Sequence, residues 1–343
     1  MSVIAFYRIG KRRSPVWNVA FSKYLEIVIK LIKLMALPLY VVKKNYLTIL
    51  PLNSMWKAIA QNISETIQRP FEIEQKRSVS GGCINQGYAI TGNGLTYFVK
   101  LNQASQQAMF IAESLGLQQM SATETIRVPQ SICSGISEKS SYLVLEWLEL
   151  GGATSGSWLE MGRKLAAMHR HSGSNQFGWE RDNTIGSTTQ VNPWTTSWAD
   201  FFAEFRIGYQ LKLAQRKGGN FTNSAKIIEK TRNYLKNRNP QPSLVHGDLW
   251  SGNAAILKTG EPVIFDPAVY YGDREVDIAM TELFGGFPAA FYQGYNEIFP
   301  LDSGYSDRKT LYNLYHILNH FNLFGGGYGS QAERMIQQIF SDS

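Results

Sequence analysis

Residues 244–257 read LVHGDLWSGNAAIL, the most informative stretch of this 343-residue chain. An apolar strand end leads into a polar loop with the spacing His246, Asp248 and Asn253, and a second apolar run follows. Phosphoryl transfer needs a carboxylate aimed at the acceptor hydroxyl and, about one turn further on, an amide oxygen that helps to bind magnesium. We therefore interpret Asp248 as a candidate catalytic base and Asn253 as a candidate magnesium ligand.

A second acidic residue follows at a matching distance. Asp266 lies thirteen residues after Asn253, behind the strand-like run PVIF and at the start of D-P-A. A carboxylate in this place suits the magnesium ion that bridges nucleotide phosphates. One such residue means little alone, but H-x-D-x4-N followed by an apolar strand and D-P is a specific pattern for phosphotransfer.

Such a site also needs a strand lysine for the α- and β-phosphates and a helix glutamate that orients it. Lys100 ends the strand-like TYFVK, and Glu113 follows thirteen residues later in the helical run MFIAES. Taken alone, Lys100 reads as a solvated strand-end lysine, and the downstream motif reverses that interpretation. Small residues ahead of this strand would let backbone N–H groups approach the phosphates: Gly81, Gly82, Cys83, Ile84 and Asn85.

The order of periodic segments predicts the fold class. Strands separated by turns are expected over residues 71–102, with an Asn93-Gly94 hairpin, then a helix over 104–120 and two strands near 130–136 and 141–148. From Gly156 onward the pattern is helical. We predict an α+β fold with two lobes in the manner of protein kinases: an N-lobe (55–148) with a five-stranded antiparallel sheet plus one helix, and a mainly helical C-lobe (149–343).

The last N-lobe strand ends where the composition turns helical, at the place where a two-lobed kinase has its hinge. We expect the backbone of Glu146, Trp147 and Leu148 to pair with adenine; the alternative is an ordinary buried strand. ATP and magnesium are therefore the expected cofactors.

Charge is unevenly distributed along the chain. The net charge is +7, yet residues 1–54 hold nine Lys or Arg against Glu26 alone, so the remaining residues carry a charge of −1. A nucleic-acid partner is not expected, because such binding needs a concentrated basic surface. Residues 1–54 form a basic amphipathic extension, for which three interpretations stay open: binding at a membrane surface, packing against the body, or an untranslated stretch before a true start at Met55.

The residues from about Met55 onward resemble the fructosamine kinase (ketosamine 3-kinase) family, which is related to aminoglycoside and choline phosphotransferases. The resemblance is carried by GGCINQGY (81–88), YFVK (97–100), MFIAE (109–113), LVLEWLEL (143–150), FGW (177–179), HGDLWSGN (246–253), DPAVYYGDREVDIAM (266–280), ELFGGF (282–287) and LYHILNHFNLFGGGY (314–328). It implies ATP-dependent phosphorylation of O3 of a ketoamine, which destabilises the sugar adduct and frees the amine. It also implies the same residue roles as the reasoning above.

Other readings of the chain remain open. The acceptor could be another small hydroxyl compound such as an aminoglycoside, choline or a sugar, and a non-catalytic nucleotide-binding scaffold is a further alternative. A regulated protein kinase is disfavoured, because Asp266 begins D-P-A and no Ala-Pro-Glu follows at activation-loop distance. The two cysteines, Cys83 and Cys133, are far apart and favour a reducing cytoplasm.

Several single residues carry expectations of their own. We expect Asp277 to cap a helix over 278–284 and His169, His316 and His320 to be core histidines. An aromatic wall beside Trp250 would stack on a sugar, drawn from residues that are otherwise mostly core by their spacing: Trp194, Trp198, Phe201, Phe202 and Phe205. Cys83 is either a small residue that fits its turn or a redox-active thiol, so the chain is expected as a monomer or as a dimer linked through Cys83.

Overall fold

The computed structural model describes residues 54–340 except 80–83, 172, 220 and 222. The predictions for the basic extension and for Gly81, Gly82 and Cys83 therefore lie outside the described residues. Within the described part of the chain, no helix has the length and apolar character needed to cross a membrane.

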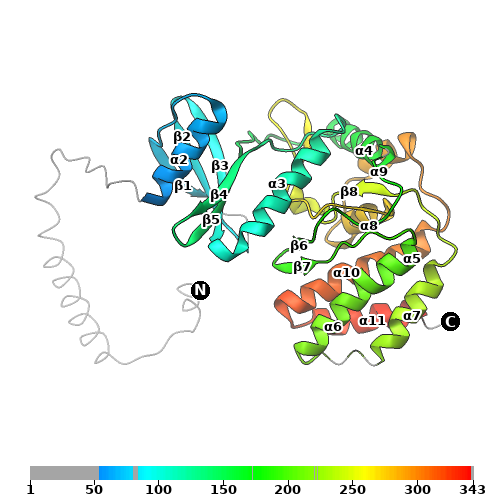
Figure 1. Cartoon of the computed structure of the whole chain (residues 1–343). Coiled ribbons are helices and arrows are strands. Elements are labelled where there is room, and N and C mark those ends of the chain that lie inside the picture. The colour runs from blue at the N-terminus through cyan, green and yellow to red at the C-terminus, as the bar shows by residue number, and fades with distance from the viewer. Residues whose placement is uncertain (1–53, 80–83, 172, 220, 222, 341–343) are drawn as a thin grey trace, which may run out of the picture. The chain divides into compact units, whose positions relative to one another are not determined.

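A five-stranded sheet forms the N-lobe, as predicted (Figure 1). Its order is β1-β2-β3-β5-β4 and every pairing is antiparallel. The strands are β1 Gln75–Val79, β2 Gln86–Gly92, β3 Leu95–Gln103, β4 Ser131–Ser137 and β5 Ser140–Glu146. Asn93 and Gly94 join β2 to β3 with φ values of 50° and 74°, the left-handed backbone that a tight two-residue hairpin turn requires.

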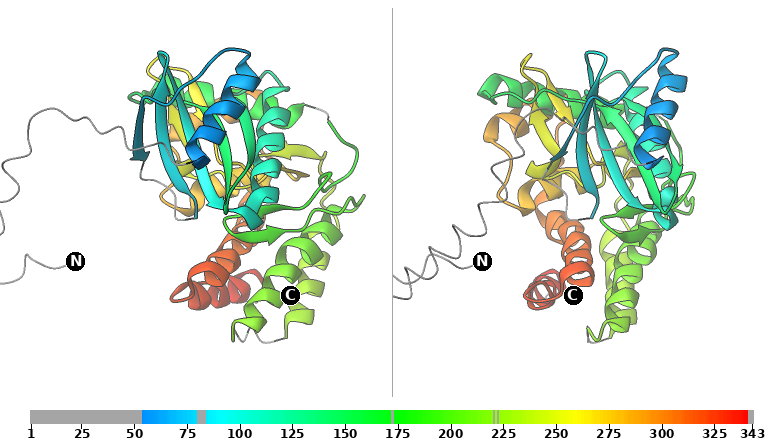
Figure 2. Two further views of the ribbon diagram at one scale, coloured as in Figure 1. Left: turned by 60° about the vertical axis from the view of Figure 1, so that its left-hand side comes forward. Right: turned by 90° about the vertical axis from the view of Figure 1, so that its left-hand side faces the viewer.

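Two helices lie against this sheet (Figures 1 and 2), where the sequence predicted one. The predicted helix is α3 Gln107–Ser121, and the additional one is α2 Ser54–Ile67. The apolar residues of α2, Trp56, Ile59 and Ile63, recur at helical spacing and are buried against one face of the sheet. Because that sheet face is apolar, the amphipathic stretch completes the N-lobe core.

The C-lobe is mainly helical, as predicted (Figure 1). Its helices are α4 Ser155–Arg170, α5 Trp198–Phe201, the π-helix η2 Phe202–Gly208, α6 Tyr209–Arg216, α7 Ser224–Leu235, α8 Glu275–Leu283, α9 Ala289–Ile298, α10 Tyr305–Phe324 and α11 Tyr328–Phe340. Short strand pairs lie among them: β6 Asn183–Ile185 with β7 Thr188–Gln190, β8 Ser243–Val245 with β11 Tyr270–Gly272, and β9 Ala254–Ile256 with β10 Pro262–Ile264.

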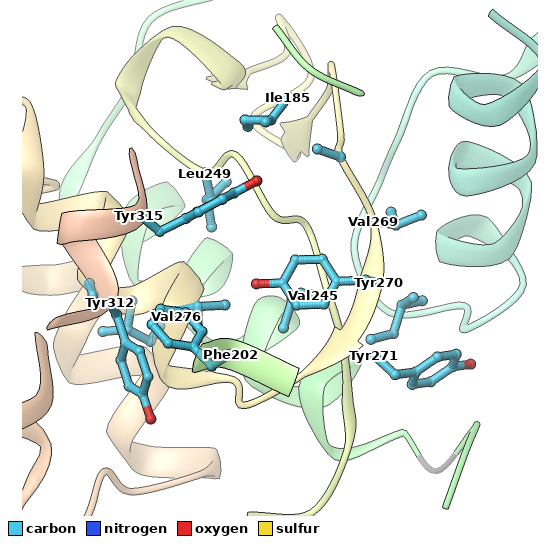
Figure 3. Packing of buried hydrophobic residues seen from close by; sticks show 14 of the residues in the cluster. Ile185, Phe202, Val245, Leu249, Val269, Tyr270, Tyr271, Val276, Tyr312 and Tyr315 are labelled. Carbon is cyan, nitrogen blue, oxygen red and sulfur yellow. The ribbon is translucent and has the colours of Figure 1, made fainter. Parts of the chain in front are cut away.

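An apolar cluster joins these short strands to the helices behind them (Figure 3). Neighbouring residues of β11 point in opposite directions, so Tyr270 and Tyr271 pack into different parts of the cluster. Leu249, which lies between Asp248 and Trp250, is fully buried in the same cluster. The polar loop after β8 is therefore anchored in the core by one of its own side chains.

Candidate active site

The loop between β8 and β9 carries Asp248 and Asn253 and holds them together. Residues Ser251–Asn253 form a short 3-10 turn. The turn lets Asn253 Nδ2 donate to the Asp248 carbonyl oxygen at 2.8 Å and to its carboxylate Oδ2 at 3.2 Å. The amide group of Asn253 thus orients the Asp248 carboxylate. The Oδ1 atom of Asn253 is the atom predicted to bind magnesium.

His246 ties this loop to the segment that bears Asp266. Its Nδ1 accepts the Asp248 backbone N–H at 3.2 Å, and its Nε2 lies 2.9 Å from the Phe265 carbonyl oxygen. Both contacts are satisfied by the neutral tautomer that carries its proton on Nε2. Burial lowers the pKa of His246, which keeps the ring in that neutral form.

Asp277 supports the same loop from behind, and the prediction that it caps a helix is wrong. Helix α8 begins at Glu275, so Asp277 lies inside its first turn. The fully buried carboxylate accepts the backbone N–H groups of His246 at 2.6 Å and Gly247 at 2.8 Å, and lies 3.0 Å from His169 Nε2. Burial by itself would raise the pKa of Asp277, but the hydrogen bond and charge of His169 outweigh it and lower the pKa.

The three histidines predicted to lie in the core are buried or partly buried. His169 is fully buried, and its second ring nitrogen lies 2.7 Å from the Tyr295 hydroxyl. His316 is buried, and burial lowers its pKa to about 3. His320 is partly buried between Phe284 and Tyr328.

Lys100 joins the two lobes at the site. Its Nζ donates to Glu113 Oε1 and to Asp266 Oδ1, each at 2.6 Å, so residues 166 positions apart in sequence come into contact. Burial by itself would lower the pKa of Lys100, but the charges of Asp266 and Glu113 outweigh it and raise the pKa. Burial also raises the pKa of Glu113. The structure thus brings three predicted site residues to one point.

Asp266 lies close enough to Asp248 to affect the pKa of the Asp248 carboxyl group. Burial, and then the charge of Asp266, raises the pKa of Asp248 to about 7. Asp266 itself has φ 58°, a left-handed conformation that Asp tolerates better than most residues and that clusters at functional sites. The Phe265 N–H donates to the Asn253 carbonyl oxygen at 3.0 Å, which fixes the residue before Asp266 beside the end of the loop.

Asn253 and Asp266 offer the oxygen ligands that magnesium prefers. The Asp266 side chain is about half exposed, at 47%, so part of the carboxylate remains accessible. Among the described residues, no group of three or more His, Cys, Asp or Glu is placed to hold a metal by itself. A pair of protein ligands fits magnesium, which is bound by one or two carboxylates together with substrate phosphates.

Glu146, the first residue of the predicted adenine hinge, makes contacts within the N-lobe through both its side chain and its backbone N–H. The Glu146 carboxylate forms an ion pair with Arg127 and accepts the Gln130 N–H at 3.1 Å, while the Glu146 N–H donates to the Gln130 carbonyl oxygen at 2.9 Å. In the described part of the chain, the backbone groups of Trp147 and Leu148 take part in no backbone hydrogen bond. These two residues therefore have the backbone groups that a purine would use.

The described part of the predicted phosphate segment consists of Ile84 and Asn85. Asn102 on β3 donates to the Asn85 side-chain oxygen at 2.7 Å, so Asn85 is anchored to the strand that carries Lys100. Ile84 is exposed at 36%. The sequence did not reveal that Asp277 holds the loop before Asp248 or that His169 holds Asp277, because no local pattern signals a contact between segments so far apart in the chain. The ion pair of Arg127 with Glu146 was likewise not predicted.

The two-lobed fold and this set of polar residues define a kinase that phosphorylates a hydroxyl group. The model of the family "Fructosamine kinase" matches residues 55–342, and the chain belongs to this family.

Two relatives of this chain are named as kinases of ketoamines or ribulosamines. A probable ketoamine kinase from Synechocystis is 64% identical over 291 residues, covering 84% of this chain and 99% of that protein. The chloroplastic protein-ribulosamine 3-kinase of Arabidopsis thaliana is 44% identical over 274 residues, covering 77% of this chain and 82% of that protein.

Solved structures show the same fold. The crystal structure of a candidate fructosamine-3-kinase from Haemophilus somnus has a TM-score of 0.79 with 37% identity, covering 83% of this chain and 97% of that chain. A thermostable mutant of the aminoglycoside phosphotransferase APH(4)-Ia, solved in a ternary complex with ADP and hygromycin B, has a TM-score of 0.57 with 14% identity, covering 82% of this chain and 97% of that chain. The second likeness concerns the fold alone.

Proposed function

We propose that this protein transfers the γ-phosphoryl group of ATP to O3 of a ketoamine, the sugar adduct formed on an amine by glycation. The observation that carries the proposal is the position of Lys100 Nζ, 2.6 Å from both Glu113 and Asp266. This contact brings together three residues at one point between the lobes: the lysine that we propose to bind phosphate, the glutamate proposed to orient it and the aspartate proposed to bind metal. The ketoamine class and the O3 position rest on family membership and on the names of the relatives.

Asp248 takes the role of the base in this proposal. As the acceptor oxygen bonds to phosphorus and the bond to the ADP oxygen breaks, the hydroxyl proton passes to the Asp248 carboxylate. A pKa near 7 suits a group that accepts a proton at neutral pH. Asn253 orients the carboxylate through its 3.2 Å hydrogen bond to Oδ2.

Binding of the nucleotide is divided among the other site residues. Lys100 contacts the phosphates, and the backbone of Trp147 and Leu148 pairs with the purine. Asn253 and Asp266 would hold magnesium, which when bound would neutralise negative charge on the transferred phosphoryl group.

Trp250 is the aromatic residue best placed for the sugar. It is exposed at 38%, lies two residues after Asp248, and packs edge-on to Phe284 at a ring distance of 6.3 Å. Trp198, Phe201 and Phe202 are buried, as their spacing predicted for core residues, so they do not form an aromatic wall beside Trp250. From Trp250 the aromatic side chains continue instead to Phe284 and His320, whose rings are 4.9 Å apart.

The product chemistry gives the enzyme its role. Phosphorylation of the adduct makes it unstable and releases the amine, so the proposed role is deglycation. We place the protein in the cytoplasm, as the two widely spaced cysteines suggest.

The proposal is tested by measuring ATP- and magnesium-dependent phosphorylation of fructosyl-, ribulosyl- and erythrulosyl-lysine. We expect turnover on at least one adduct and a loss of about 10²- to 10⁴-fold in kcat for Asp248→Asn, with nucleotide binding retained. Asp307→Asn is the matched control, because that residue is exposed in the first turn of α10.

Two results would contradict the proposal. Equal turnover by wild type and Asp248→Asn would exclude Asp248 as the base. Nucleotide binding without turnover on any ketoamine would move the function to another hydroxyl acceptor.

A further inference from the structure

An exposed arginine on the edge strand of the sheet reaches the hinge. The Arg77 guanidinium carbon lies 4.9 Å from the ring centre of Trp147. Arg77 belongs to β1, which ends directly before the predicted phosphate segment, whereas Trp147 follows β5. Within the described part of the chain, Arg77 forms no ion pair, so this stacking contact is what positions its charge.

The strand register shows how far this contact extends. Arg77 stands opposite Ala89 of β2, Ala89 opposite Phe98 of β3, and Phe98 opposite Leu145 of β5. Neighbouring strands are about 4.8 Å apart, so three strand spacings, or roughly 14 Å, separate the backbones at the two ends of this row. The long side chains of Arg77 and Trp147 therefore reach across this row of residues. Ala89 and Phe98 lie in the middle of the row, and the side chain of Ala89 is only a methyl group.

This bridge lies on the face of the sheet that serves the active site. Paired residues on neighbouring strands project to the same face, and so do residues two apart on one strand. Phe98 and Lys100 are two apart on β3, so Arg77 shares the face that carries Lys100. The neighbouring Lys76 projects to the opposite face, where its ammonium lies 4.6 Å from the ring of Trp56 on α2.

We propose that Arg77 and Trp147 together cover the outer edge of the adenine-binding site, so that the purine base of ATP lies against the row from Ala89 to Leu145 beneath the stacked pair. Arg77 is then a positioning residue for the purine that acts through Trp147. The proposal rests on the proposed nucleotide-binding function and adds a determinant of nucleotide affinity outside the polar kinase residues.

The test measures the affinity of the full chain for ADP and for adenosine by titration calorimetry. We expect Arg77→Gln to weaken the binding of both ligands roughly two- to fivefold, as fits the loss of a cation–π contact made by an exposed arginine. The KM for ATP should rise by a similar factor while the KM for the ketoamine stays unchanged. Arg77→Lys, which keeps the positive charge, should restore part of the affinity.

Lys76→Gln is the matched control. It removes one positive charge and the contacts with the rings of Trp56 and Tyr88 from the same strand, but on the face covered by α2. We expect its affinity for ADP to stay within about twofold of wild type, because the lost contacts are on the other face. In a Trp147→Leu background, Arg77→Gln should cause little further loss, because the two residues act as one unit.

Several outcomes would overturn the inference. Unchanged affinity in Arg77→Gln, or an equal loss in Lys76→Gln, would exclude a cover formed by Arg77. A loss confined to ADP, with adenosine unaffected, would show that Arg77 binds phosphate instead. If the wild type binds neither ADP nor adenosine, the proposed function fails together with this inference.

Discussion

The carboxylate of Asp277 accepts the backbone N–H of Gly247 at 2.8 Å, across thirty residues of sequence. The other oxygen accepts the His246 N–H at 2.6 Å. A buried carboxylate on α8 thus fixes the backbone just before Asp248, and His169 in turn holds that carboxylate. The position of Asp248, the proposed base, therefore depends on a buried residue of another element.

Replacing Asp277 by Asn should weaken both the fold and catalysis. The amide NH2 group cannot accept a hydrogen bond, so at least one buried loop N–H loses its partner. We expect a loss of about 2–4 kcal/mol in the free energy of unfolding at pH 7 and at least a tenfold fall in kcat. Urea unfolding and steady-state kinetics measure the two effects, with Asp307→Asn as control; wild-type values for both would contradict the role of Asp277.

Comparing the wild type with Asp277→Asn also gives a prediction about the pH dependence of stability. The folded pKa of Asp277 is lowered, so its ionisation stabilises the fold fully above the unfolded pKa of about 4. This contribution is lost as pH falls through the folded pKa. The difference in unfolding free energy between wild type and Asp277→Asn should therefore shrink below about pH 4. A difference that stays constant from pH 7 to pH 3 would speak against a buried, ionised Asp277.

Gly247 should not tolerate alanine. Its φ is 80°, and a Cβ added there would lie 2.1 Å from the Ala268 carbonyl oxygen. Gly260 is the matched control, because its φ is 88° but an added Cβ would meet no atom within 4 Å. Gly260→Ala should cost about 1–2 kcal/mol of stability from the backbone conformation alone, and Gly247→Ala clearly more, with loss of activity. Equal thermal and kinetic effects of the two variants would refute a steric requirement at Gly247.

Lys100 and Glu113 should act as one unit toward ATP. Lys100→Met is expected to lower kcat/KM for ATP by about 10²-fold or more, because the phosphates lose their cation. Glu113→Gln alone should have a smaller effect, since the Asp266 contact still holds Lys100. In the Lys100→Met background, Glu113→Gln should add almost nothing. Fully additive losses in this double-mutant cycle would show that the two residues act separately.

Cys133 on β4 should react slowly with thiol reagents in the folded protein. Burial raises its pKa to about 12, so at pH 8 its thiolate is about 10³-fold rarer than that of a free cysteine with a pKa of about 8.5. Alkylation followed by peptide mass analysis should show slow labelling of Cys133 and rapid labelling after denaturation. Rapid labelling of the native protein would contradict its burial.

If peroxide induces a disulfide-linked dimer, that dimer should survive Cys133→Ser and disappear in Cys83→Ser.

The local sequence indicated most of the chemistry, because phosphotransfer needs particular polar groups at short and regular spacings. Asp248 and Asn253 lie on one loop and Asp266 follows the next strand, so their order in the chain already implied a shared site. The Asn93-Gly94 turn and the strand-like runs separated by turns likewise indicated the five-stranded sheet. The hairpin between β2 and β3 depends on near neighbours in the chain, whereas the pairing of β3 with β5 joins residues as far apart as Phe98 and Leu145.

The sequence left other features open because they depend on contacts between distant segments. The contact of Lys100 with Asp266 spans 166 residues, and the side-chain pairing of Arg77 with Trp147 joins an edge strand to the hinge. Asp277 was read as a helix cap, since an Asp near a helix start usually serves its own first turn.

By itself, the sequence determined the two-lobed α+β fold class with its five-stranded antiparallel sheet, and it indicated the candidate site residues, because residue types and their periodicity encode both. Only the tertiary structure decided which of these residues meet and what supports them. Burial of α2, Leu249 and Asp277 depends on the complete core, and desolvation there, together with the charge of Asp266, raises the pKa of Asp248 to about 7. Such burial is a property of the whole packed chain, and no short stretch of sequence carries it.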